Sequence, residues 1–395
     1  MIRRRQPHLL RSAVLGVALA GALLLWRFRG SLRNRITERL VLSNDSPSQQ
    51  VIEGIIQKAP YPDAALAAEW NSGKIIQREV AIQTLRSITT VGQPLPPELE
   101  SILLSATLDA DMDVRESAFG LLRDRNDPAL PALAAAQLRD PDPETRILGL
   151  NYLRQMKAAI GVPIVIPLLD DGDSLIVATV LSMLENWSGA EFGVRMRDAT
   201  NSSKVEAGAS RAKAWWAAHR LEFPSTQLDV PREAIAAHIL IPVGNFSLSA
   251  LDGRTVELSD FHGKVVLINF WTTWCTACVA EIPELIELRK QCGENVAILG
   301  ISLDSVADGA AGQSESALHE KVERTAKARG INYPILLDEK DHVGSRFNGG
   351  ELPTTVIVDA QGNVRRRFIG PRTLAVFHAM IAEASTPIAL TPSLR

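Results

Sequence analysis

Two cysteines three residues apart, Cys275 and Cys278, are the part of this sequence best suited to chemistry. They lie in the stretch WTTWCTACVAE, directly after an apolar run and directly before a helix-like pattern. A pair at this spacing can be a redox couple, half of a metal site or two buried thiols. The chain of 395 residues has one further cysteine, Cys292, so the surrounding sequence has to distinguish the three.

A zinc site and a haem attachment site each need further Cys or His residues near the pair, and the sequence lacks them. A zinc site usually takes four Cys or His ligands, but no second CxxC pair occurs and His262 is the closest histidine in sequence. Haem attachment needs a histidine directly after the second cysteine, where Val279 stands. Three cysteines are also too few for a disulfide framework. We therefore expect neither a metal ion nor a cofactor.

The elements that must position the pair follow an α/β pattern. The stretch around Asp252-Gly253 alternates as a hairpin does, and a helix is expected after the cysteines to about Cys292, with another ending near Gly330. Continuous apolar runs are typical of buried strands. They predict strands at Lys264–Phe270 and Val296–Leu303, and Tyr333–Leu337 is a further expected strand. Thr354–Asp359 and Asn363–Ile369 are expected to form a hairpin across Gln361-Gly362, followed by a closing helix at Phe377–Glu383. This β-α-β-α-β-β-α order is the thioredoxin arrangement.

The stretch WTTWCTACVAEIP resembles the active site of thioredoxin-fold proteins. Within them it is similar to the TlpA/ResA-like membrane-anchored thiol–disulfide oxidoreductases, over about residues 240–385. Four features match at that family's spacing: Trp274 before the first cysteine, Pro283 five residues after the second, Asn269 six residues before Cys275, and Leu352-Pro353-Thr354-Thr355 where the family keeps a cis-proline loop. CxxC alone would be a weak signal, but together these matches are specific.

The resemblance implies a redox-active disulfide between Cys275 and Cys278. In such a fold Cys275 lies at the first turn of a helix, where free N–H groups lower a thiol pKa from about 8.5 into the range of roughly 3.5–7.5. We expect Cys275 to attack a partner's disulfide and Cys278 to resolve the mixed disulfide. The family uses a Glu at the position of Glu281 to tune the second thiol; the alternative is a solvated helix Glu.

The same resemblance implies that Trp274, Leu352 and Pro353 bind substrate, because a cis-proline would place backbone groups beside the pair for an extended peptide. Relatives often have a proline before the second cysteine, whereas this chain has Thr276-Ala277. Since that residue influences the redox potential, the direction of electron flow stays open.

Two further sulfur chemistries concern Cys292 and the sequence before Cys275. Cys292 is expected to be a buried helix-end thiol, with a second resolving role as the alternative. The peroxiredoxin motif P-x-x-x-T-x-x-C is matched at Thr272 but has Ile268 in place of its proline, which argues against peroxide chemistry.

A second domain is indicated by a repeat over residues 50–220. Asp109, Asp140 and Asp171 are 31 residues apart, and so are Asp111, Asp142 and Asp173. An Asp-rich turn caps the next helix, and helix pairs that cannot bury their apolar faces alone stack on one another. The pattern resembles HEAT repeats and predicts an all-α solenoid. Trp215-Trp216 near its end is either a seal for the core or an anchor for a partner.

The N-terminus predicts a membrane anchor over residues 1–30. Ser12–Trp26 is free of charge and is flanked by arginines on both sides. An uncleaved anchor fits better than a signal peptide, because the A-x-A stretch lies inside the apolar run; a buried N-terminal helix is the other alternative. Both flanks are basic, so the positive-inside rule gives no orientation.

These expectations combine into a multidomain protein: an anchor, a HEAT-like solenoid, a linker at residues 221–243 and a thioredoxin-like α/β domain at residues 244–387. We expect a thiol–disulfide oxidoreductase on the periplasmic face of a bacterial inner membrane, where disulfides persist. Its partners would be a disulfide-bearing protein, a membrane or periplasmic redox partner and a protein bound by the repeats; the family often acts in cytochrome c maturation. A net charge of −3 argues against nucleic acid. The alternative function is a non-enzymatic interaction scaffold.

Overall fold

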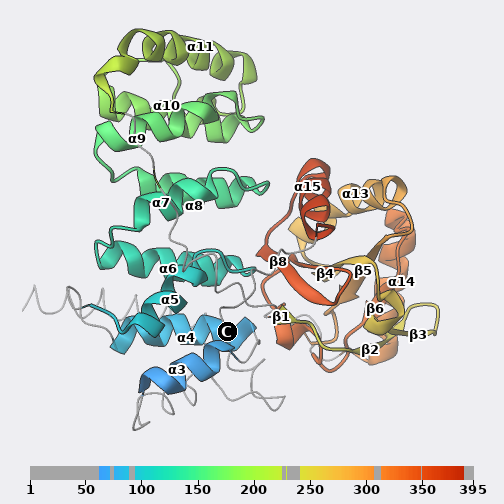
Figure 1. Ribbon diagram of the computed structural model, residues 1–395. Helices are drawn as coiled ribbons and strands as arrows, with labels where there is room; N and C mark the ends of the chain where they lie inside the picture. Colours follow the sequence, from blue (N-terminus) through green and yellow to red (C-terminus); the bar gives the residue numbers. More distant parts are fainter. Residues whose placement is uncertain are drawn as a thin grey trace, which may run out of the picture.

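The computed structural model describes residues 62–71, 75–88, 94–224, 228, 241–306, 313–347 and 349–386. It consists of a helical region followed by an α/β part with the thioredoxin-like element order (Figure 1), as expected at that level of detail. The predicted anchor and most of the predicted linker lie outside the described residues. Within the ranges given above, no helix is both long and apolar enough to cross a membrane.

The helical region is a stack of helices packed layer upon layer (Figure 1). Its elements are α3 (Pro62–Asn71), α4 (Ile75–Ile88), α5 (Pro97–Ala106), α6 (Met112–Asp124), α7 (Leu130–Gln137), α8 (Pro143–Leu153), α9 (Ala158–Val165), η1 (Ile166–Asp170), α10 (Ser174–Ser188), η2 (Met196–Asp198), α11 (Ser202–His219) and η3 (Arg220–Glu222).

The predicted aspartate caps are confirmed in three successive layers. Asp111 accepts the backbone N–H of Asp113 at the start of α6, at 2.8 Å. Asp142 caps α8 and Asp173 caps α10 in the same way. A capping carboxylate satisfies N–H groups that the helix itself leaves unpaired and opposes the positive end of the helix dipole. The 31-residue spacing thus repeats one helix-starting turn.

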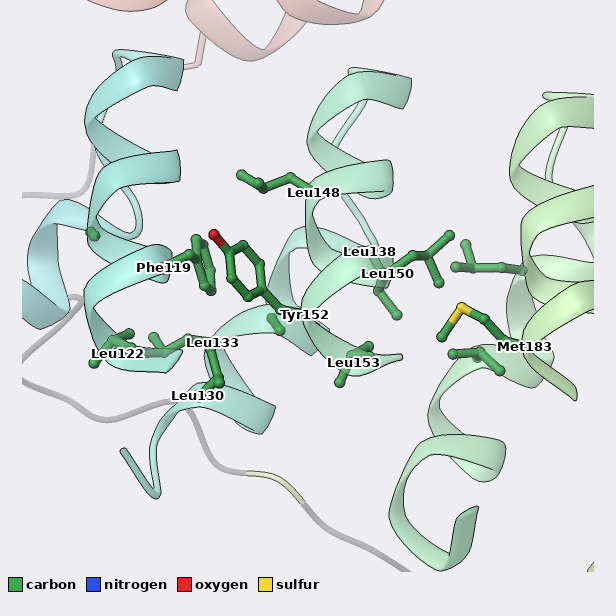
Figure 2. Close-up of a cluster of buried hydrophobic side chains, with 14 of the residues drawn as sticks. Phe119, Leu122, Leu130, Leu133, Leu138, Leu148, Leu150, Tyr152, Leu153 and Met183 are labelled. Carbon is green, nitrogen blue, oxygen red and sulfur yellow. The ribbon is translucent and has the colours of Figure 1, made fainter. Parts of the chain in front are cut away.

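Apolar side chains from neighbouring layers interdigitate in the core of the helical region (Figure 2). The ring of Phe119 on α6 stacks on that of Tyr152 on α8, with 5.1 Å between centroids. Gly149 lets α8 approach α7, because a Cβ there would lie 2.6 Å from the carbonyl oxygen of Ala134. Near the far end, Trp215 packs against Phe192 and Trp216 against Phe223, so the tryptophan pair packs against the core.

The α/β part is built on one eight-stranded sheet in the order β1-β8-β7-β4-β5-β6-β2-β3. Strands β4, β5 and β6 are parallel, β7 pairs antiparallel with β4, and β8 pairs antiparallel with β7. Its elements are β1 (Ile241–Pro242), β2 (Ser247–Ala250), β3 (Thr255–Glu257), η4 (Leu258–Phe261), β4 (Val265–Trp271), α13 (Thr276–Gln291), β5 (Val296–Ser302), α14 (Glu315–Arg329), β6 (Ile335–Leu337), η6 (Gly344–Phe347), β7 (Thr354–Val358), β8 (Asn363–Ile369) and α15 (Leu374–Ala384).

Strand β4 is buried along its whole length because both faces of the sheet are covered. Side chains alternate between faces along a strand. On one face Val265, Leu267 and Trp271 pack with residues of α13, α14 and α15. On the other, Ile268 packs in a cluster that also includes Ile75 of α4. The helical region therefore contributes to the core beneath the sheet, and β8 and α15 face it (Figure 1).

Candidate functional site

The two cysteines lie where β4 ends and α13 begins. Cys275 is the N-cap of α13, and its sulfur accepts the backbone N–H of Cys278 at 3.1 Å. The two sulfurs are joined in a disulfide, and both residues are buried, Cys278 more deeply. The start of a helix stabilises a negative charge, so a thiolate released from this disulfide at Cys275 lies where the backbone favours it.

Glu281 lies one turn further along α13 and is buried beneath the pair. It is 1% exposed, so it is not the solvated helix residue of the alternative interpretation. One carboxylate oxygen accepts the side-chain amide of Asn269 at 3.0 Å, and the other accepts the backbone N–H of Arg372 at 2.8 Å. Asn269 also donates to Thr355 on β7. Cys278 and Glu281 are three residues apart, so they share one helix face.

Opposing effects act on the pKa of Glu281. Burial raises its pKa from 4.5 to about 7, while the Arg372 N–H, the Asn269 amide and the charge of Arg372 act in the opposite direction. A group with a pKa near the working pH can both accept and donate a proton. The carboxyl group is therefore suited to exchanging a proton with the thiol of Cys278.

The loop before β7 approaches the same end of β4. The register pairs Asn269 with Thr355 and Phe270 with Thr354, which brings Pro353 to the end of β4. The Leu352–Pro353 peptide bond is cis, in agreement with the sequence. Leu352 packs against the cluster that contains both cysteines, and the Pro353 carbonyl accepts the N–H of Gly370 at 2.8 Å.

Trp274 differs from its neighbours because it is 49% exposed. A large exposed aromatic next to a reactive pair is typical of a contact surface. Cys292, by contrast, is the C-cap of α13, at the opposite end of a 16-residue helix from Cys275. It is a half-buried free thiol, and burial raises its pKa. The structure therefore brings Cys275, Cys278 and Glu281 together and leaves Cys292 apart.

Sequence reasoning missed two residues beside the site. Asp304, after β5, accepts the backbone N–H of Thr273 at 3.0 Å and its hydroxyl at 2.6 Å, and so fixes the loop that carries Trp274. Its position directly after a parallel strand could have revealed it, because such strand ends meet at one edge of the sheet. Arg372 is the second residue; its contact with Glu281 is made by the backbone, which no residue type signals.

A parallel β4-β5-β6 core, a disulfide at the head of α13, a buried glutamate and a cis-proline loop define a thioredoxin-fold thiol–disulfide oxidoreductase. Comparison with known proteins agrees. The AhpC/TSA family model matches residues 241–367. The thiol-disulfide oxidoreductase ResA of Geobacillus thermodenitrificans is 36% identical over 133 residues, which are 33% of this chain and 68% of that protein. ResA of Bacillus subtilis is 32% identical over 34% of this chain and 69% of that protein.

The chain accordingly belongs to the ResA family of thiol–disulfide oxidoreductases, and it is an enzyme of that class. Among solved structures, a thioredoxin family protein from Chlorobium tepidum TLS, described as a thiol:disulfide interchange protein, is 28% identical, with a TM-score of 0.31 over 36% of this chain and 94% of that chain. The helical region lies outside the residues that the family model matches.

Proposed function

We propose that this protein reduces disulfides in protein substrates, with Cys275 as the attacking thiolate, Cys278 as the resolving thiol and Glu281 as the proton acceptor. The observation that carries the proposal is the buried carboxyl of Glu281, held by Asn269 and Arg372 on the same helix face as Cys278. Burial raises the pKa of this carboxyl group to about 7. A protein that only bound partners through this domain would not need such a group.

The proposed reaction transfers two electrons and two protons. The reduced Cys275 thiolate attacks one sulfur of the substrate disulfide, forming a mixed disulfide and releasing one substrate thiolate, which takes up a proton. Glu281 accepts the proton of Cys278, whose thiolate then attacks the Cys275 sulfur. The Cys275–Cys278 disulfide forms, and the second substrate sulfur leaves as a thiolate that takes up the proton held by Glu281. A dithiol redox partner returns two electrons to the pair.

We place substrate contacts at Trp274, Leu352 and Pro353. Trp274 offers an exposed aromatic surface, and the loop with the cis peptide bond lies at the end of β4 beside the cysteines. An extended segment of the substrate would lie between these two features, as peptides do when backbone groups and pockets share the recognition.

A trapping experiment tests the proposal. Cys278→Ala leaves Cys275 able to attack but removes the resolving thiol, so mixed disulfides with natural substrates should accumulate in the native host. Mass spectrometry after non-reducing purification would identify them, and they should disappear on reduction. The matched control is the double variant Cys275→Ala/Cys278→Ala, which should trap nothing. Equal recovery from both variants, or no adduct from either, would contradict the mechanism.

The helical region is proposed to be a HEAT-like platform that holds the substrate protein. Support comes from its repeated caps and from two exposed apolar side chains at the start of its later layers, Leu175 at 44% and Met196 at 46% exposure. In the trapping background, Leu175→Ser with Met196→Ser should lower the yield of protein adducts while leaving the reaction with a small aromatic disulfide unchanged.

We further propose that residues 1–30 tether the protein to a bacterial inner membrane with the catalytic domain in the periplasm. The charge-free run Ser12–Trp26 and the need for persistent disulfides support this. Alkaline phosphatase, which matures only outside the cytoplasm, should be active when fused to the C-terminus, and deletion of residues 1–30 should abolish that activity. An inactive fusion of the full chain at normal expression would overturn the proposal.

A further inference from the structure

Three arginines of the α/β part reach the aspartates that begin successive layers of the helical region. Arg366 binds Asp140 at 2.7 Å and Arg367 binds Asp111 at 3.0 Å. Arg372 forms a two-pronged contact with Asp142, Nε to Oδ1 at 2.9 Å and a terminal nitrogen to Oδ2 at 3.1 Å. The side chains of all three arginines are at most 9% exposed. Asp111 and Asp142 are helix N-caps and Asp140 lies in the turn before one, so the turns that start the helices also hold the neighbouring domain.

Arg372 is the member of this set that also contacts the redox site. Its backbone N–H donates to Glu281, while its guanidinium lies over the ring of Phe368, 4.7 Å from the centroid, and donates to the carbonyls of Ile369 and Gly370. The carboxylate of Asp142 therefore holds the guanidinium of Arg372, while the backbone N–H of Arg372 holds the carboxylate of Glu281. In the described part of the chain, Arg372 is the residue that forms hydrogen bonds with both carboxylates.

The groups around Glu281 determine how strongly the charge of Arg372 acts on the pKa of Glu281. On its own helix α13, Glu281 is accompanied by Cys278 and by Glu284, whose charge raises its pKa. From β4 comes the neutral amide of Asn269, and from the segment before β6 the phenol of Tyr333, whose pKa is raised by burial and by Glu281. Arg372, after β8, is the cation in this set, and its charge lowers the pKa of Glu281.

We propose that Arg372 is a positioning residue for proton transfer at Glu281, and that the helical region controls it through Asp142. The inference rests on the proposed role of Glu281 as proton acceptor. Asp142 neutralises the guanidinium and holds it in place, so the contact between the two domains sets the pH range over which Cys278 can be deprotonated. The helical region is then part of the redox centre as well as a platform beside it.

Substitutions at Arg372 and at Asp142 should shift the titration midpoint of Glu281 in opposite directions. Arg372→Gln removes the cation, so Glu281 should bind its proton more tightly and the midpoint of its titration should rise by about one pH unit. Asp142→Asn keeps a good helix cap but leaves the guanidinium uncompensated, so the midpoint should fall by a similar amount. If ionised Glu281 limits the resolving step, the rate at pH 7 should fall about fivefold in Arg372→Gln. Arg372→Lys should restore the midpoint.

The resolving step can be followed directly with 5,5′-dithiobis(2-nitrobenzoate). Reduced full-length protein releases one aromatic thiolate when Cys275 attacks and a second when Cys278 resolves, and stopped-flow absorbance separates the two phases. The second phase, measured from pH 5 to pH 9, should show the shifted midpoints. The double variant Arg372→Gln/Asp142→Asn should match Arg372→Gln alone, because Asp142 acts through Arg372.

Two matched controls separate this role from general support of the fold. Arg366→Gln removes an equally buried arginine of the same interface that pairs with Asp140 and Glu383, and Asp173→Asn changes the equivalent cap one layer further along. Neither should move the midpoint. A shift in Arg366→Gln as large as in Arg372→Gln, or no shift in Arg372→Gln, would overturn the inference. If Glu281→Gln left the pH profile unchanged, the proposed proton acceptor itself would be wrong.

Discussion

Cys275→Ser should abolish disulfide reduction, with a loss on the order of 10³-fold or more, the scale expected when a nucleophile is removed. A serine hydroxyl stays protonated near neutrality, and it cannot form the mixed disulfide through which exchange proceeds. The N-cap position stabilises a negatively charged thiolate at Cys275, but it does little to ionise a hydroxyl. The fold should survive, because serine is a better N-cap than cysteine.

Reduction of insulin by the protein with a dithiol donor, followed by turbidity, measures this loss. Cys292→Ser is the matched control: it removes a half-buried thiol at the other end of α13 and should retain full activity. Cys278→Ser should lose turnover but still release one aromatic thiolate in the stopped-flow reaction. If Cys275→Ser kept its turnover while Cys292→Ser lost it, the roles of the thiols would have been assigned to the wrong residues.

The thioredoxin-like part could be predicted largely because its signals are local. Apart from Lys264 and Asn269, the stretch Lys264–Phe270 is apolar, and β4 is buried along its whole length. Asp252-Gly253 predicts a tight turn, and Gly253 has a φ of 80° there, in the left-handed region that favours glycine. The cysteine spacing and the Leu352–Pro353 pair were also visible, although bringing them together needed the resemblance to a family.

The repeat predicted which aspartates begin helices but not what else they bind. An Asp–Arg pair such as Asp140–Arg366 is 226 residues apart in the sequence, and nothing local to either residue specifies the register between two domains. The repeat predicts Asp-rich turns that cap the next helices, which the structure confirms, but it does not predict the arginines that these aspartates bind. The run Arg365-Arg366-Arg367 lies within β8, which is otherwise a buried strand. Because buried charges need partners, these arginines indicate that acidic groups lie nearby.

Arg367→Ala should cost about 3–5 kcal/mol of stability, the range for breaking a buried ion pair by removing one partner. Its guanidinium is 1% exposed and lies 3.0 Å from both Asp111 and Asp113. Burial alone would lower the pKa of Arg367, but these carboxylates outweigh it and raise that pKa. Without the arginine, the buried carboxylate of Asp111 keeps the N–H groups at the start of α6 and its electrostatic interaction with Arg78.

Urea unfolding followed by tryptophan fluorescence and circular dichroism measures the loss. Because the Arg367 guanidinium joins the two domains, and its backbone N–H to Ala110 is the contact that the variant keeps, the variant should unfold in two transitions where the wild type shows one. Adding Asp111→Ser, which removes the stranded charge but keeps a capping oxygen, should recover a large part of the stability, since a buried pair costs most when only one member is lost. A loss below about 1 kcal/mol, the value of a surface pair, would mean that water reaches this contact and that the two domains are held together elsewhere.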